Sequence, residues 1–139
     1  MTVLDTNVVS ELMRPLPSDQ VVRWTRSRAV GELFTTAITV AEIFYGIERL
    51  PIGKRRAAFE AAAEAILTDE FAGRVIGFDS HAARAFAIIA ARRRALGKPI
   101  SQSDAQIAAI VQICGATLAT RNLADFENCD IKIIDPWAG

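Results

Sequence analysis

Hydrophobic and polar positions follow two alternating patterns along this chain. Short runs of β-branched and apolar residues indicate buried strands, and apolar residues that repeat every three or four positions indicate helices with one buried face. One such stripe comprises Val40, Ile43, Phe44, Ile47 and Leu50. The pattern predicts strands at 2–4, 33–38, 74–78, 117–119 and 131–134, and helices at 8–13, 18–28, 39–50, 54–71, 80–96 and from a cap at Ser101 or Ser103 to 113.

The order of these segments predicts the fold class. Strands that alternate with helices of this length are joined by right-handed crossovers into a mostly parallel sheet with helices on both faces. No repeat, low-complexity tract or linker interrupts the pattern, and 139 residues suit one domain of ordinary size. We therefore expect an α/β protein, a three-layer α/β/α sandwich with a mostly parallel central sheet, formed as a single domain over residues 1–139.

Composition excludes some classes of protein. Hydrophobic residues make up 51% of the chain, yet no window has the roughly 18 consecutive apolar residues of a membrane helix, and the N-terminal MTVLDTN lacks the pattern of a signal peptide. Cys114 and Cys129 lack metal-ligand spacing and are expected to be buried. With 16 basic and 16 acidic side chains, the net charge gives no argument for nucleic-acid binding. We expect a cytoplasmic protein without membrane contact.

Acidic and polar residues follow the predicted strands. Asp5 comes directly after the first strand, Glu42 lies one turn into the helix after the second, and Asp104 opens a later helix on its core-facing side. The polar residues that follow strand 117–119 are Thr120, Asn122 and Asp125. Because ligand crevices in parallel sheets lie at the carboxyl ends of the strands, we expect these residues to meet at one edge.

Each acid also has an ordinary structural explanation: Asp5 as a turn residue, Glu42 as a solvated helix residue and Asp104 as a helix cap. Convergence of all three favours a site instead, because carboxylates brought together repel one another and require a countercharge. Oxygen ligands without a His or Cys cluster favour Mg²⁺ or Mn²⁺ over zinc. Such ions activate water and stabilise charge on a phosphoryl group.

Four segments carry a resemblance to a known family. They are VLDTNVVSEL (3–12), TTAITVAEIFYGI (35–47), LGKPISQSDAQIAA (96–109) and LATRNLADFE (118–127). With these segments in this order, nearly the whole chain resembles PIN-domain ribonucleases of the VapC and FitB kind, the toxins of bacterial type II toxin–antitoxin operons. The resemblance implies a PIN-like fold.

The resemblance also implies roles for individual residues. Asp5, Glu42 and Asp104 stand at the family's metal-binding acidic positions, which makes them candidate catalytic and metal-binding residues. At the fourth position many members have aspartate, whereas this chain has Asn122 with Asp125 three residues further on, and either could be the fourth site residue. We expect one tightly held Mg²⁺ or Mn²⁺ and a second that arrives with substrate. Thr6 and Thr120 would orient the carboxylates through their hydroxyls.

The reaction implied is metal-dependent hydrolysis of an RNA phosphodiester. The basic residues expected to hold the RNA backbone are Arg49, Arg92, Arg93, Lys98 and Arg121. The implied partners are an RNA substrate, a second copy of the chain in a homodimer, and a cognate antitoxin that binds DNA when complexed and whose tail fills the crevice. The sequence leaves open whether the complex with antitoxin contains this dimer or a larger hetero-oligomer. His81 is expected on a helix surface, and Trp24 and Trp137 as core or dimer contacts rather than base-stacking platforms.

Two alternatives remain open at the level of sequence. One keeps the fold and the metal but changes the substrate class, for instance to DNA. The other is a non-catalytic binding protein, for which the substitution of an acid by Asn122 is the main internal argument.

Overall fold

A five-stranded parallel sheet forms the centre of the molecule. The computed structural model describes residues 1–138. The strands are β1 (Thr2–Leu4), β2 (Leu33–Thr36), β3 (Val75–Ile76), β4 (Thr117–Ala119) and β5 (Lys132–Ile134). They lie in the order β3-β2-β1-β4-β5, and every pairing is parallel. The expected α/β fold is confirmed, and the sheet is wholly rather than mostly parallel.

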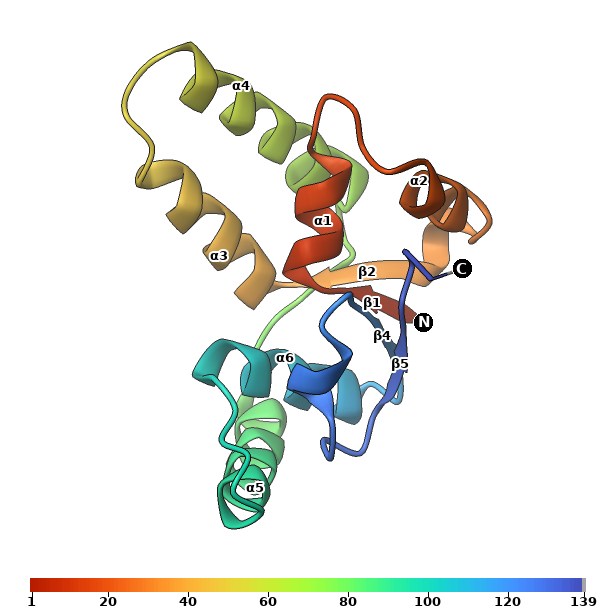
Figure 1. The fold of residues 1–139 in the computed structure, drawn as a ribbon, viewed down its shortest axis with the longest axis vertical. Coiled ribbons are helices and arrows are strands. Elements are labelled where there is room, and N and C mark those ends of the chain that lie inside the picture. The colour runs from red at the N-terminus through yellow and green to blue at the C-terminus, as the bar shows by residue number, and fades with distance from the viewer. Residues whose placement is uncertain (139) are drawn as a thin grey trace.

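Helices cover both faces of this sheet. The α-helices are α1 (Thr6–Leu12), α2 (Asp19–Arg26), α3 (Ala37–Glu48), α4 (Lys54–Ala63), α5 (Ser80–Ala95) and α6 (Gln102–Ile113). Helices α1 to α4 lie on one side of the strands, and α5 and α6 lie on the other (Figure 1). The short strands alternate between the two cores: Val3 packs against α5 and α6, whereas Leu4 packs against the helices of the opposite face. No helix within residues 1–138 is long and apolar enough to cross a membrane.

Two helices begin earlier than the sequence pattern predicts, and polar caps explain both. The Asp5 carboxylate accepts a hydrogen bond from the Thr6 backbone N–H and caps α1, which starts at residue 6 rather than 8. The Thr36 hydroxyl accepts from the backbone N–H of Thr39, so β2 stops at Thr36 and α3 starts at once. Both junctions therefore bring a helix N-terminus directly to the carboxyl end of a strand.

The segment predicted as one helix over 54–71 changes its winding. Helix α4 ends at Ala63, and Glu64–Glu70 continues as a π-helix that ends with the Phe71 N–H donating to the Ile66 carbonyl. Ala63, Leu67 and Phe71, four residues apart, are all buried. They lie on the side of this segment that faces the core, so the change from α to π winding does not interrupt its buried face.

Arg93 of α5 ties the C-terminal part of the chain to the helical layer. Its side chain is 5% exposed, and it donates to the backbone carbonyls of Lys98 (2.7 Å), Asp125 (2.7 Å) and Glu127 (3.0 Å). The expectation that Arg93 contacts RNA is therefore wrong, because its side chain is buried and its Nε and Nη1 donate to backbone carbonyls inside the protein. Its role is to hold the short 3₁₀ turn Leu123–Phe126, which follows β4.

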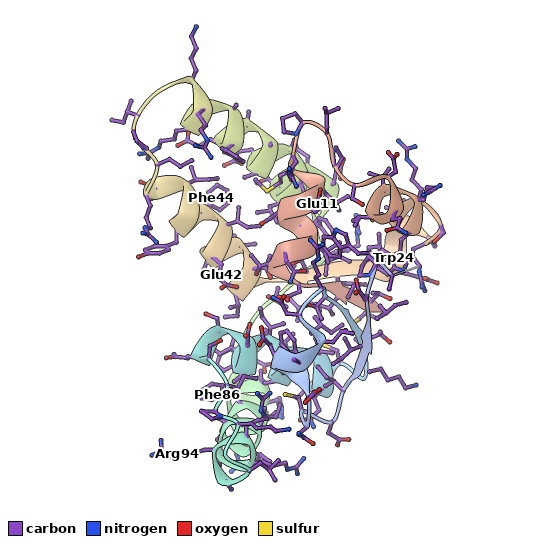
Figure 2. The ribbon with its side chains drawn as sticks, in the orientation of Figure 1. Glu11, Trp24, Glu42, Phe44, Phe86 and Arg94 are labelled. Atoms are coloured by element: carbon purple, nitrogen blue, oxygen red, sulfur yellow. The ribbon has the colours of Figure 1, made fainter. Side chains whose placement is uncertain are left out.

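The neighbours of Arg93 differ from it because a helix presents consecutive residues in different directions. Arg92 and Arg94 are exposed, and Arg94 projects away from the molecule (Figure 2). The run of three arginines is thus one buried anchor between two solvated side chains.

We predict that Arg93→Met lowers the free energy of unfolding by about 3 kcal/mol, because it leaves buried carbonyl groups without a charged donor. The matched substitution Arg92→Met, at an exposed position of the same helix, is expected to change it by less than about 0.5 kcal/mol. Urea unfolding of the two variants measures both effects, and equal values would contradict the anchoring role.

Candidate functional site

The ends of three adjacent strands bring the sequence-predicted acids to one edge of the sheet. Asp5 follows β1, and Glu42 projects from α3, which follows β2, beside the start of α1 (Figure 2). Thr120 follows β4, the other neighbour of β1. Asp104 comes from the first turn of α6, which leads into β4. This is the crevice position expected of a parallel sheet.

Asp5 is buried and held by neutral donors. One carboxylate oxygen, Oδ1, accepts from the backbone N–H of Thr6 at 2.8 Å. The other, Oδ2, accepts from the Thr120 hydroxyl at 2.8 Å and from the Asn7 amide at 3.3 Å. These hydrogen bonds hold the Asp5 carboxylate in one orientation, and the Thr120 hydroxyl has the orienting role that we expected from the sequence.

Asn7 is a site residue that the sequence analysis did not single out. Its Nδ2 donates to the Thr120 hydroxyl at 3.2 Å as well as to Asp5, and its Oδ1 accepts from the backbone N–H of Arg121 at 3.3 Å. It thus joins the segments after β1 and β4. Its place directly after Asp5 and Thr6 in the DTN run was the available signal.

Glu42 is oriented by a chain of threonine hydroxyls. Thr6 Oγ1 lies 2.7 Å from Glu42 Oε1 and 3.1 Å from Thr39 Oγ1. Because a carboxylate only accepts, the single Thr6 proton goes to Glu42, and the buried Thr39 hydroxyl donates to Thr6. The expected orienting role of Thr6 therefore has a defined partner, and Thr39 supports it from below.

Asp104 does not cap its own helix. The N-cap of α6 is Ser101, whose hydroxyl accepts from the Asp104 backbone N–H at 3.2 Å. Since Ser101 performs the capping, the half-buried Asp104 carboxylate is left to line the crevice. The geometry thus favours the site over the structural explanation for this residue.

A single pocket of about 640 Å³ contains these groups. The residues that line it are Asp5, Thr6, Asn7, Ser10, Glu11, Arg14, Glu42, Phe59, Asp104, Arg121, Asn122 and Trp137. Asn122 lines the pocket, whereas the exposed Asp125 does not. Within residues 1–138, no three acidic, His or Cys side chains approach closely enough as they stand to ligate one ion together.

The pKa values of two acids show the cost of this arrangement. Burial raises the pKa of Asp5 to about 6, with a smaller contribution from the charges of Asp104 and Glu42, although the hydrogen bonds from Thr120 and Thr6 oppose the shift. The pKa of Asp104 is also raised, chiefly by burial, with further contributions from the negative charges of Asp125 and Glu42. The donor set therefore fits a hard divalent cation, because carboxylate and amide oxygens surround a pocket that disfavours additional negative charge.

Most of the predicted basic residues lie away from this pocket. Only Arg121 of the expected set lines it. Arg49 lies at the far end of α3 with its guanidinium 5.7 Å from the Tyr45 ring centre, and Lys98 lies 3.7 Å from the Glu127 carboxylate. Arg14 lines the pocket but was not predicted, and it pairs with Glu11 at 3.4 Å.

The chain is similar to known proteins in both sequence and structure. The PIN domain family model matches residues 2–132. The chain is 40% identical to the VapC ribonuclease Y4jK of Sinorhizobium fredii, across 99% of this chain and 98% of that protein. It is 36% identical to Toxin FitB of Neisseria gonorrhoeae, across 99% of both chains. A solved structure of FitAB bound to an IR36 DNA fragment superposes with a TM-score of 0.90 at 36% identity, covering 99% of this chain and 96% of that one.

We predict a pH-dependent stability that originates at Asp5. Its pKa is raised from 3.8 to about 6 in the folded chain, so the folded state holds a proton that the unfolded state releases between these values. In EDTA, this group stabilises the fold most at low pH, and up to about 3 kcal/mol is lost as the pH rises from about 4 to about 7. Urea unfolding across this range should show the loss in wild type and a flatter profile in Asp5→Asn.

The control for this measurement is Asp69→Asn, at an exposed position of the π-helix remote from the pocket. It is expected to retain the wild-type pH profile. A wild-type profile in Asp5→Asn would mean that the burial of Asp5 is not the source of the effect.

Proposed function

Because this chain belongs to the PIN-domain family, among its VapC and FitB toxins, we propose that it is a divalent-metal-dependent endoribonuclease and the toxin of a toxin–antitoxin pair. The observation that carries the proposal is the pocket shared by Asp5, Glu42 and Asp104 at the carboxyl edge of the parallel sheet. A pocket of oxygen ligands suits the hydrolysis of a phosphodiester better than acyl transfer, because acyl transfer requires a nucleophilic side chain next to a general base.

Asp5, Asp104 and Glu42 are the residues that would hold Mg²⁺ or Mn²⁺. When bound, such an ion lowers the pKa of water and neutralises charge that develops on the phosphate and the leaving oxygen. Asn122 presents its amide to the same pocket and is the better placed fourth residue, while Asp125 acts on Asp104 only through its charge.

The other polar residues act by positioning. Thr120 and Asn7 fix the orientation of Asp5, and Thr6 fixes that of Glu42. Arg121 brings a positive charge to the rim of the pocket, where an RNA phosphate must approach, whereas the other basic residue of the lining, Arg14, pairs with Glu11. In this proposal the carboxylates hold the ion, and the Arg121 guanidinium attracts the RNA phosphate.

The relatives also suggest the partners. Solved complexes include FitAB bound to an IR36 DNA fragment and DNA-bound VapBC from Salmonella typhimurium. We propose that a cognate antitoxin binds this chain, fills the acidic pocket with a basic side chain, and forms a DNA-binding complex in which the chain is a homodimer or part of a larger assembly. The acidic lining of the pocket gives such a side chain its countercharge.

We predict that Asp104→Asn lowers RNA cleavage in Mg²⁺ or Mn²⁺ at least about a hundredfold, because one charge that holds the cation is lost. The fold should be unaffected, since Ser101 caps the helix through the backbone N–H of residue 104, which the substitution retains. Cleavage of total RNA with and without EDTA, with the new ends sequenced, measures activity, and urea unfolding measures stability.

Asp69→Asn serves as the charge-matched control and should cleave like wild type. Cleavage that persists in EDTA or in Asp104→Asn would overturn the proposed site. Cleavage of DNA but not RNA would assign the other substrate class, and no cleavage under any of these conditions would favour a binding protein without catalytic activity.

Asn122→Asp is expected to bind Mn²⁺ about tenfold more tightly, because it adds a carboxylate to the pocket. Asp125→Asn should change the affinity by less than about twofold, since Asp125 does not line the pocket. Calorimetric titration of both variants with Mn²⁺ compares them, and a larger effect of Asp125→Asn would make Asp125 the fourth site residue.

A further inference from the structure

Arg121 and Trp137 form a cation–π pair on the rim of the acidic pocket. The guanidinium carbon of Arg121 lies over the indole ring, 4.8 Å from its centre, and both residues line the pocket. The sequence analysis placed Trp137 among core or dimer contacts. In the structure Trp137 packs against the hydrophobic cluster on the α1 side of the sheet, and it also lines the pocket.

The ends of two neighbouring strands build this pair. Arg121 follows β4 and Trp137 follows β5, and the backbone N–H of Thr120 donates to the Ile134 carbonyl at 2.9 Å. The Asp135 carboxylate accepts from the Trp137 backbone N–H at 2.9 Å. Since Asn7 accepts from the backbone N–H of Arg121, the pair is connected directly to the residues that orient Asp5.

The Arg121 guanidinium is available to a ligand. Within residues 1–138, no carboxylate lies at ion-pair distance from it and no side-chain hydrogen bond uses its donors, and the residue is exposed. The Arg74–Phe71 pair offers a contrast, because Arg74 donates to the backbone carbonyls of Val30, Leu33 and Glu70. The Arg74 side chain therefore holds these backbone segments together, whereas the Arg121 side chain keeps its donors available.

A guanidinium whose carbon lies over an aromatic ring is covered by that ring on one side, and its other side and its N–H donors remain open to a ligand. An unpaired nucleobase stacks on such an open face, and the rim donors can bind a phosphate oxygen at the same time. Indole beneath the guanidinium restricts its motion, which lowers the entropy lost when a base stacks on it.

We propose that Trp137 and Arg121 form a stacking platform for an unpaired base of the RNA next to the bond that is cleaved. The inference rests on the proposed ribonuclease function, and it adds that the substrate must be single-stranded or flipped out at this nucleotide. A base within a duplex keeps both faces stacked on its neighbours and cannot occupy the platform.

The test measures RNA binding without cleavage. The background protein is Asp104→Asn in EDTA, which removes one negative charge from the pocket. The probe is a labelled single-stranded RNA of about eight nucleotides, compared with a series in which one base at a time is replaced by an abasic ribose. We expect one position at which loss of the base weakens binding about tenfold, measured by fluorescence anisotropy.

Variants of the pair then assign that position. Arg121→Lys keeps the charge but loses the plane, and Trp137→Leu loses the ring; each should weaken binding of the complete RNA about tenfold and make the abasic substitution neutral. Trp137→Phe should restore most of the base-dependent affinity. Tyr45→Leu, which removes the ring beneath Arg49 outside the pocket, is the matched control and should change nothing.

Base-dependent binding that survives both Arg121→Lys and Trp137→Leu would overturn the platform, as would abasic losses that are small and equal at every position. Wild-type cleavage of RNA in Mg²⁺ is measured in parallel. Cleavage with base-independent binding contradicts the platform alone, whereas base-dependent binding through Trp137 without any cleavage contradicts the ribonuclease function alone.

Discussion

The rest of this structure depends on one buried negative charge, the carboxylate of Asp5. It lies at the carboxyl end of the central strand of the sheet, and its hydrogen-bond donors are a backbone N–H, a hydroxyl and an amide, all neutral. These donors fix its orientation without cancelling its charge. Burial and the neighbouring acids raise its pKa, so the chain carries a local instability that the proposed divalent cation would relieve.

The arrangement around Asp5 follows from connecting parallel strands. Each strand end is also the start of a helix or turn, so the same few residues cap helices, orient carboxylates and form the pocket wall. Thr36 and Thr39 illustrate this economy: one starts α3, and the other donates toward Thr6, which holds Glu42. The site is therefore rigid because its supporting residues are also parts of the fold.

Arginine has contrasting roles in this chain, and its surroundings decide which role each residue has. Arg93 is buried and donates hydrogen bonds to backbone carbonyl groups that would otherwise lack donors. These hydrogen bonds hold the turn after β4 in place. Arg121 starts that same segment but remains exposed at the pocket. Arg93 thus stabilises the segment that carries Arg121 to the pocket.

The sequence by itself determined the fold class and the candidate acids, because strand and helix periodicity are local properties and because residues after parallel strands must meet at one edge. Asp5, Glu42, Asp104 and Asn122 all line the pocket as their positions in the pattern indicated. Helix boundaries were less accurate, since the caps at Asp5 and Thr36 and the π winding after Ala63 depend on side-chain contacts.

Only the tertiary structure decided the remaining roles. The sequence shows three consecutive arginines at 92–94 without distinguishing them. In the structure α5 turns only Arg93 toward the interior and leaves Arg92 and Arg94 exposed. Arg121 stands far from Asn7 in sequence and meets it only because β4 pairs with β1, and Trp137 meets Arg121 because β5 pairs with β4. Such contacts between distant segments have no local pattern, because they arise from the order in which strands assemble into the sheet.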